Sequence, residues 1–206
     1  MALERLGGKD YQAAFLVVDR NPEALSQARG ITLARVEVVV AEAGAFLAEH
    51  LREGAAWDWI IPAVPIHVAT SWLRRGPLRD VDWEAAEVPS EVAALAPGAH
   101  RGREGELYLS RALHLCPDDC PEPEACPVTG ESRGVPLSEE LAALEVPGYE
   151  LAVIASHQLA PGVGGFTPER LLALARDLAG PEGKILVATA CRCHGVAHGF
   201  QRRARR

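Results

Sequence analysis

The clearest fold signal in the chain is KILVATACRCHG, residues 184–195. Its first seven residues form a nearly continuous apolar run, which is typical of a strand buried on both faces of a parallel sheet. Cys191, Cys193 and His194 follow immediately. The expected strand therefore brings three metal-ligating side chains to its own carboxyl end, the edge at which open α/β sheets bind ligands.

A second strand and a helix are predicted just before this stretch. Leu151–Ala155 is an apolar run that indicates another buried strand. Thr167, Pro168 and Glu169 then supply a capping residue, a first-turn proline and a first-turn acid, which predict a helix ending near Gly180. We therefore expect a parallel strand–helix–strand unit at the end of the chain.

The first half of the chain shows the same alternation. Strands are predicted over 13–18, 36–40 and 59–61, and helices over 21–30, 43–51 and 68–73. This order predicts the α/β class with a doubly wound, mostly parallel, Rossmann-like sheet. A short helix at 2–6 has no strand before it. The first strand of the unit is thus lacking, and we expect the coding region to continue upstream of Met1.

The whole chain, 1–206, is interpreted as a single Rossmann-like α/β domain. Its length of 206 residues is enough to bury a substantial core. Residues 76–148 are poorly periodic and carry several prolines and acids. We interpret this segment as an insertion or linker that contains a cysteine-rich loop.

Composition and charge exclude several classes of protein. The formal net charge of −7 disfavours a nucleic-acid-binding surface. No run approaches the roughly 18–20 apolar residues of a membrane span, and the N-terminal residues have no apolar signal core. The basic tail, 202–206, is predicted to be a solvated terminus. We expect a cytoplasmic protein that makes no contact with membranes or nucleic acid.

The five cysteines lie in two short loops and nowhere else. Cys116, Cys120 and Cys126 have the spacing C-x3-C-x5-C, and each is followed by proline, which stiffens the loop. Without a secretion signal, reduced thiols are expected rather than disulfides. We predict one metal site or iron–sulfur cluster held by these three cysteines, with a fourth ligand from Cys191 or Cys193.

Other residues near that predicted site complete the hypothesis. His194 is the reserve ligand, and His157 is a candidate to orient a ligand from outside the coordination sphere. The cofactor is either zinc or an iron–sulfur cluster. The alternative is a loop of unconnected thiols.

Two features favour a nucleotide such as NAD(P). Asp19 ends a predicted strand ahead of a capped helix, where an acid accepts hydrogen bonds from ribose hydroxyls. Gly162, Gly164 and Gly165 lie between a predicted strand and a predicted helix, where a glycine-rich turn holds an anion. The glycine spacing is neither G-x-G-x-x-G nor that of a P-loop, so a tight structural turn between the strand and the helix is favoured over anion binding. His67, just past a predicted strand, is interpreted as a helix-start residue.

Four stretches resemble an uncharacterised family of bacterial cytoplasmic proteins. These are similar to the nucleotide-binding Rossmann domains of potassium-uptake regulators. The resemblance implies a glycine-rich turn upstream of Met1. It rests on residues 58–65, 116–131, 156–165 and 190–195.

Three functions remain open. The first is a Rossmann-like, nucleotide-associated protein with a cysteine-ligated metal or iron–sulfur site and a redox or regulatory role. The second is a methyltransferase that uses S-adenosylmethionine, which residues 18–25 suit. The third is a non-catalytic regulatory module with structural zinc. A small-molecule nucleotide is the expected partner, a homo-oligomer is compatible with the sequence, and no catalytic residue or substrate is identified.

Overall fold

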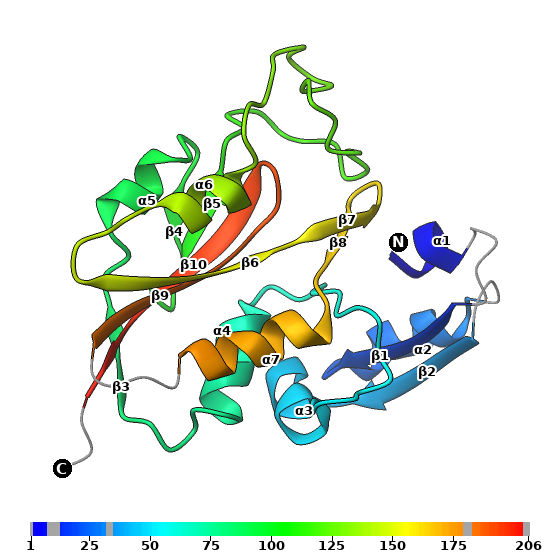
Figure 1. The fold of residues 1–206 in the computed structure, drawn as a ribbon. Helices are drawn as coiled ribbons and strands as arrows, with labels where there is room; N and C mark the ends of the chain where they lie inside the picture. Colours follow the sequence, from blue (N-terminus) through cyan, green and yellow to red (C-terminus); the bar gives the residue numbers. More distant parts are fainter. Residues whose placement is uncertain (1, 8–12, 32–34, 179–182, 204–206) are drawn as a thin grey trace.

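The computed structural model describes residues 2–7, 13–31, 35–178 and 183–203 (Figure 1). Its helices are α1 (Ala2–Gly7), α2 (Pro22–Arg29), α3 (Ala43–His50), α4 (Val68–Arg75), α5 (Ser90–Ala94), α6 (Leu137–Ala143) and α7 (Pro168–Asp177). Its strands are β1 (Ala14–Asp19), β2 (Arg35–Val40), β3 (Trp83–Ala86), β4 (His100–Arg101), β5 (Leu107–Ser110), β6 (Tyr149–Ala155), β7 (His157–Ala160), β8 (Val163–Gly165), β9 (Gly183–Ala190) and β10 (His194–Arg202).

The main sheet is mixed and mostly antiparallel. Its order is β4-β5-β10-β9-β6, and β3 also pairs with β10. Strand β10 is antiparallel to β9, to β5 and to β3, and β5 and β3 pair with successive parts of its length. Only β6 and β9 are parallel in this sheet. The prediction of a doubly wound, mostly parallel, Rossmann-like sheet is therefore wrong.

The turn between β9 and β10 explains this difference. A parallel neighbour needs a crossover of about a dozen residues or more, whereas three residues, 191–193, separate these strands. The Cys191 N–H donates to the His194 carbonyl at 2.8 Å, which closes a hairpin. The sequence conceals β10 because glycines interrupt its apolar pattern. A Cβ at Gly199 would lie 2.5 Å from the Ala86 carbonyl oxygen, so this glycine permits close pairing with β3.

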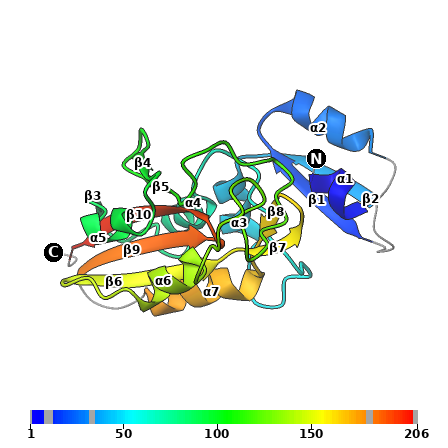
Figure 2. The same cartoon turned by 90° about the horizontal axis from the view of Figure 1, so that it is seen from above.

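The two predicted strand–helix–strand units do form. Strands β6 and β9 are parallel and joined through α7, and β1 and β2 are parallel and joined through α2. The Asn21 side chain caps α2 by accepting the Glu23 N–H at 3.0 Å. However, β1 and β2 make a separate two-stranded sheet, which lies beside the main sheet in Figure 2. The predicted strand at 59–61 has only an isolated bridge between Ile60 and Phe166.

Apolar clusters cover both faces of the main sheet. Side chains alternate along β9, so Ile185 and Val187 pack with α4 and α7, while Leu186 and Ala188 pack on the opposite face beside α5 and α6. Trp72 and Leu141, nearly or fully buried, belong to the first and second cluster. Helices on both faces hold the β9–β10 hairpin rigidly.

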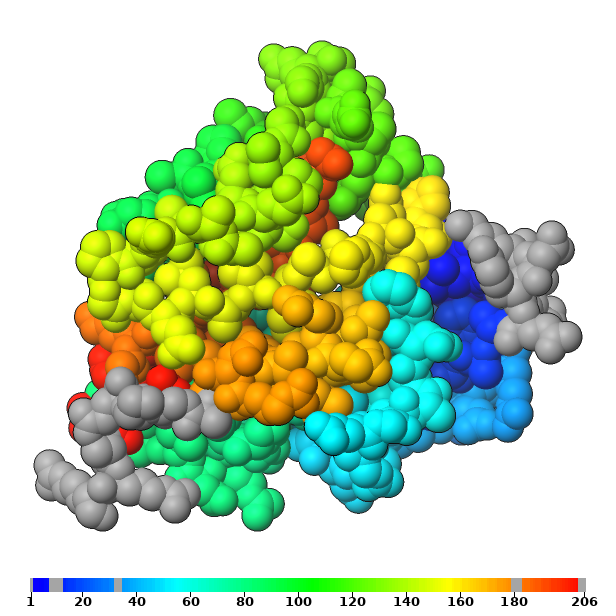
Figure 3. All heavy atoms as spheres, viewed as in Figure 1, coloured from blue at the N-terminus to red at the C-terminus, as the bar shows by residue number. Residues whose placement is uncertain are grey.

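The segment 76–148 contributes to both the sheet and the site. It supplies β3, β4 and β5 to the main sheet and helix α6 to one of its faces. Residues 111–136 within it contain no helix or strand beyond an isolated bridge between Ala125 and Ser132. We call this segment the cysteine loop; it forms the projection at the top of Figure 3.

The C-terminal arginines do not all form a solvated tail as predicted. Arg202 ends β10 and is buried, with a 3.3 Å contact from Nη2 to Glu150 Oε2. Residues 204–206 lie outside the described residues. Within the described ranges, no helix combines the length and the apolar character that a membrane crossing requires.

Candidate metal centre

The β9–β10 turn is a fixed platform for Cys191, Cys193 and His194. All three carbonyl groups of residues 191–193 accept backbone hydrogen bonds. Ser138 N–H donates to the Cys191 carbonyl at 3.2 Å, and Leu137 N–H donates to the Arg192 carbonyl at 2.9 Å. Arg111 N–H donates to the Cys193 carbonyl at 2.9 Å. The first turn of α6 and the start of the cysteine loop therefore hold the backbone of the hairpin turn.

Residues 118–120 of the cysteine loop are docked on the β7–β8 hairpin. The Cys120 carbonyl accepts from Gly162 N–H at 3.1 Å and from Gln158 Nε2 at 2.6 Å. Arg5 from α1 donates to the carbonyls of Asp118, at 2.8 Å, and Pro161, at 2.7 Å. These contacts bring the loop cysteines to the β9–β10 turn.

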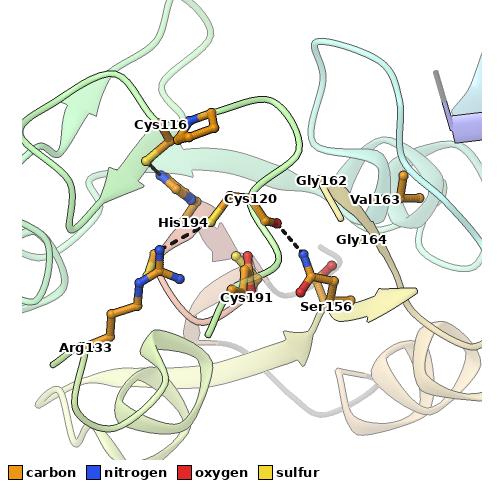
Figure 4. Close-up of a pocket in the computed structure, with 13 residues that line it drawn as sticks. Cys116, Cys120, Arg133, Ser156, Gly162, Val163, Gly164, Cys191 and His194 are labelled. Carbon is orange, nitrogen blue, oxygen red and sulfur yellow. Dashed lines mark hydrogen bonds between the residues drawn. The ribbon is translucent and has the colours of Figure 1, made fainter. Parts of the chain in front are cut away.

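The loop and the two hairpins enclose a cavity of about 220 Å³ (Figure 4). Of the predicted site residues, Cys116, Cys120, Cys191, Cys193, His194, Gly162 and Gly164 line it. Cys126, Gly165 and Asp19 are not among the lining residues. The remaining lining residues are Pro117, Glu122, Arg133, Ser156, Gln158 and Val163. Segments about 70 residues apart in sequence thus meet at one cavity.

Three side chains of metal-ligating type come close together in this cavity. One carboxylate oxygen of Glu122, Cys191 Sγ and one ring nitrogen of His194 all lie within 4.8 Å of one another. Cys116 Sγ lies 3.7 Å from His194 Nε2. Zinc bonds of about 2.3 Å to sulfur and about 2.0 Å to nitrogen at a tetrahedral angle place those atoms about 3.6 Å apart. Cys116 and His194 are therefore already spaced as two ligands of one zinc ion.

A second cluster surrounds Arg133. Its Nη2 atom donates to Cys120 Sγ at 3.3 Å, and its guanidinium also hydrogen-bonds Cys126. Its Nη1 atom is buried without a hydrogen-bond partner among the described residues. Cys126 Sγ lies 3.7 Å from His114 Nε2. The Arg133 guanidinium thus links Cys120 and Cys126. Cys191 and Cys193 lie on the β9–β10 turn, and Cys116 lies beside His194.

Thiol pKa values differ sharply across the site. Burial, and then the nearby Glu122 carboxylate, raise the pKa of Cys191 to about 12. Backbone N–H groups of Thr129 and Val128 lower the pKa of Cys126 to about 6. Burial lowers the pKa of His194, which keeps its ring neutral and able to bind a metal. In the absence of metal, Cys191 is a thiol and Cys126 is a thiolate near neutral pH.

The three glycines do not form the expected turn between a strand and a helix. Pro161 and Gly162 make the two-residue turn of the β7–β8 hairpin, and Gly162 has a φ of +68°. A Cβ there would lie 1.8 Å from the Asp118 carbonyl oxygen. At Gly164 and Gly165 a Cβ would lie 2.7 Å from Ser156 Oγ and 3.0 Å from the Ile60 carbonyl oxygen, respectively. The glycines are needed for close packing, and the premise of an anion-binding turn before a helix is wrong.

Three other predicted residues lie outside the cavity. Asp19 ends β1 and accepts the Asn21 N–H at 2.7 Å, so its ribose role stays a prediction. His157 is exposed in β7 and its ring lies edge-on to Trp59 at 5.9 Å. His67 precedes α4 as expected, but it is buried, with Nδ1 3.0 Å from His198 Nδ1.

Sequence reasoning missed two polar residues of the site. Glu122 lies between Cys120 and Cys126, and His114 lies two residues before Cys116. Both are ligand-type side chains within the cysteine loop, so the extended motif H-x-C-x3-C-x-E-x3-C was available as a signal. Cysteine spacing alone does not indicate these two ligands, because four of the five thiols already satisfy a four-ligand site.

Comparison with known proteins gives a family but no activity. The AF_1314_C family model, described as the C-terminal domain of an uncharacterized protein, matches residues 56–203. An uncharacterized protein of Archaeoglobus fulgidus is 32% identical over 209 residues, covering 91% of this chain and 88% of the relative. No solved structure shows a significant match. The matched range contains both cysteine groups, and the chain belongs to the AF_1314_C family.

Proposed function

We propose that this chain is a metal-binding protein whose zinc ion is held by Glu122, Cys191 and His194, with Cys116 as the fourth ligand. The observation that carries this proposal is the convergence of one oxygen, one sulfur and one nitrogen atom within 4.8 Å. Cys116 Sγ lies 3.7 Å from His194 Nε2 but is not one of the three atoms within 4.8 Å of one another, so it would move towards Glu122 and Cys191 when it completes the site. Zinc accepts carboxylate, thiolate and imidazole ligands together, whereas calcium and magnesium require oxygen ligands.

The proposed ion links the cysteine loop to the sheet. Cys116 and Glu122 come from the loop, while Cys191 and His194 come from the β9–β10 turn. A long loop without regular structure loses conformational entropy when it is ordered, and a metal cross-link offsets that cost. We infer that metal binding holds the loop over the cavity. This role favours a regulatory module, acting in a reducing compartment such as the cytoplasm, where the thiols stay available.

An iron–sulfur cluster is the second candidate. Four cysteines line the same cavity, Cys116, Cys120, Cys191 and Cys193, and a cubane cluster uses four thiolates. The oxygen and nitrogen donors close to Cys191 favour a single zinc ion instead. The two candidates differ in colour, because a cluster absorbs visible light and zinc does not.

Metal analysis of anaerobically purified protein tests the proposal. We expect a colourless protein with bound zinc, and zinc loss in a Cys191→Ala, His194→Ala double variant. Glu122→Gln is expected to weaken zinc binding, whereas Glu124→Gln, the matched change at an exposed carboxylate of the same loop, is not. A brown protein that contains iron would show that an iron–sulfur cluster occupies the site instead of zinc. A protein without metal, or a double variant that keeps its full metal content, would contradict the proposed site.

A further inference from the structure

The free edge of the main sheet lines a second groove, which shares no lining residue with the cavity of the metal centre. Strand β6 is the last strand of the sheet, and no strand pairs with its outer edge within the described ranges. A groove of about 250 Å³ runs along five consecutive β6 residues, 150–154. Side chains alternate between the two faces of a strand, so five consecutive residues share one groove only through their backbone edge. Figure 2 shows β6 at this edge, with α6 and α7 beside it.

This edge carries little protection against pairing. Natural edge strands carry charged residues, especially lysine, or proline or a bulge, which prevent another strand from adding to the sheet. The β6 sequence, YELAVIA, contains neither lysine nor proline, and its pairing with β9 is regular over all seven residues. Its one charged residue, Glu150, is ion-paired with Arg202 of β10 at 3.3 Å. The edge is therefore competent to accept another strand.

Helix α7 lines the same groove with one face, and the charges on that face are self-complementary. Arg170, Ala173, Leu174 and Asp177 have the spacing i, i+3, i+4, i+7, which is one side of a helix. A basic residue stands at the start of this face and an acidic residue at its end, with small and apolar residues between them. Both charged side chains are exposed, and neither makes an ion pair in the described part of the chain.

A twofold axis through the edge would match these charges. An axis perpendicular to the sheet makes β6 antiparallel to its copy, and it places the two α7 helices antiparallel on the same face of the joined sheet. In that arrangement the start of one helix lies opposite the end of the other. The basic end of each α7 helix then lies next to the acidic end of the other, and the symmetry produces this contact twice.

We propose that the β6 edge is a self-association surface, at which β6 pairs antiparallel with the same strand of a second copy and Arg170 pairs with the partner subunit's Asp177. The proposal commits to a second copy because the charge pattern of α7 is complementary to itself when reversed. It is independent of the metal site, which lies on the cysteine loop and the β9–β10 turn.

Charge reversal and charge exchange test this proposal. The mass of the full chain is measured by light scattering after size exclusion, at several protein concentrations. We expect a dimer whose dissociation constant rises at least tenfold in Arg170→Asp and in Asp177→Arg, and returns towards the wild-type value when both changes are combined. Glu169→Arg is the matched control, because it reverses an exposed charge on the neighbouring residue of α7. Zinc content is measured for each variant, so a failure of the metal site is recognised separately.

Hydrogen exchange gives a second readout. The β6 amides are expected to exchange more slowly in the wild-type protein than in Arg170→Asp. A wild-type protein that stays monomeric at every concentration would overturn the proposal, even if β6 binds an extended peptide instead. A dimer that Arg170→Asp weakens no more than Glu169→Arg does would overturn it as well.

Discussion

Replacing Gly162 by alanine is expected to separate the cysteine loop from the hairpin on which it docks. Two effects act at this position. The φ of +68° costs an L-residue about 1–2 kcal/mol. The new Cβ would also lie 1.8 Å from the Asp118 carbonyl oxygen and 2.4 Å from Arg5 Nη1. Since ordinary contacts begin near 3.4 Å, the loop must move by more than an ångström.

Gly148→Ala is the matched control for backbone strain. Gly148 has a φ of +77°, but a Cβ there meets nothing within 4 Å. Both variants therefore have a similar strain, whereas only Gly162→Ala disturbs the hydrogen bonds to the Asp118 and Cys120 carbonyls. At about 0.5–1.5 kcal/mol per hydrogen bond, losing two or three of them adds about 1–4 kcal/mol to the destabilisation.

Urea unfolding and zinc affinity distinguish the two variants. We expect Gly148→Ala to lose about 1 kcal/mol of unfolding free energy and to keep its zinc affinity. Gly162→Ala is expected to lose more stability and to bind zinc at least tenfold more weakly in competition with a chelator. Equal stability and equal zinc affinity in the two variants would refute the docking of the loop as the support of the site.

Three further predictions concern thiol reactivity, pH and the core. At pH 7 in metal-free protein, Cys126 should be alkylated first and Cys191 last, because pKa values of about 6 and about 12 make their thiolate fractions differ by roughly five orders of magnitude; peptide mass spectrometry checks the order. Burial, and then His198, lower the pKa of His67 to about 3, below its unfolded value near 6.5, so its contribution to stability is present above pH 6.5 and is lost as the pH falls toward 3. The slope is about 1.4 kcal/mol per pH unit. The stability difference between wild type and His67→Gln should therefore shrink below pH 6.5, and a constant difference would contradict this. Leu171→Ala should cost about 2–5 kcal/mol in urea unfolding because Leu171 is fully buried, and a change below 1 kcal/mol would refute its place in the core.

Local sequence signals predicted some of the elements but not the sheet. Asn21 and Pro22 determined where α2 begins, and apolar runs identified β6 and β9. The pairing of β10 with β3 and β5 joins residues about 85–120 positions apart, and only its pairing with β9 is a local hairpin. Local periodicity does not indicate such distant contacts. Gly195 and Gly199 also interrupt the apolar pattern by which β10 would be recognised as a strand. A parallel arrangement was therefore predicted where a hairpin forms.

The candidate site was predicted in part, for a similar reason. Four of the five predicted cysteines line one cavity, because the cysteine loop and the β9–β10 turn converge there, whereas Cys126 lies outside it. The sequence could not show that Arg133 lies between Cys120 and Cys126, or that Glu122 is the acid next to Cys191. Those contacts depend on how the loop folds back on itself and on how it docks on the β9–β10 turn. The glycines were misinterpreted because a turn between two strands and a turn before a helix use the same residue type.

X-ray absorption at the zinc edge of the purified protein tests the metal centre most directly. We expect a four-coordinate site with both sulfur ligands at about 2.3 Å and nitrogen or oxygen ligands at about 2.0–2.1 Å. The sulfur contribution should fall by half in Cys116→Ser. A zinc spectrum with sulfur ligands alone, or a protein with no zinc signal at all, would contradict the site formed by Cys116, Glu122, Cys191 and His194.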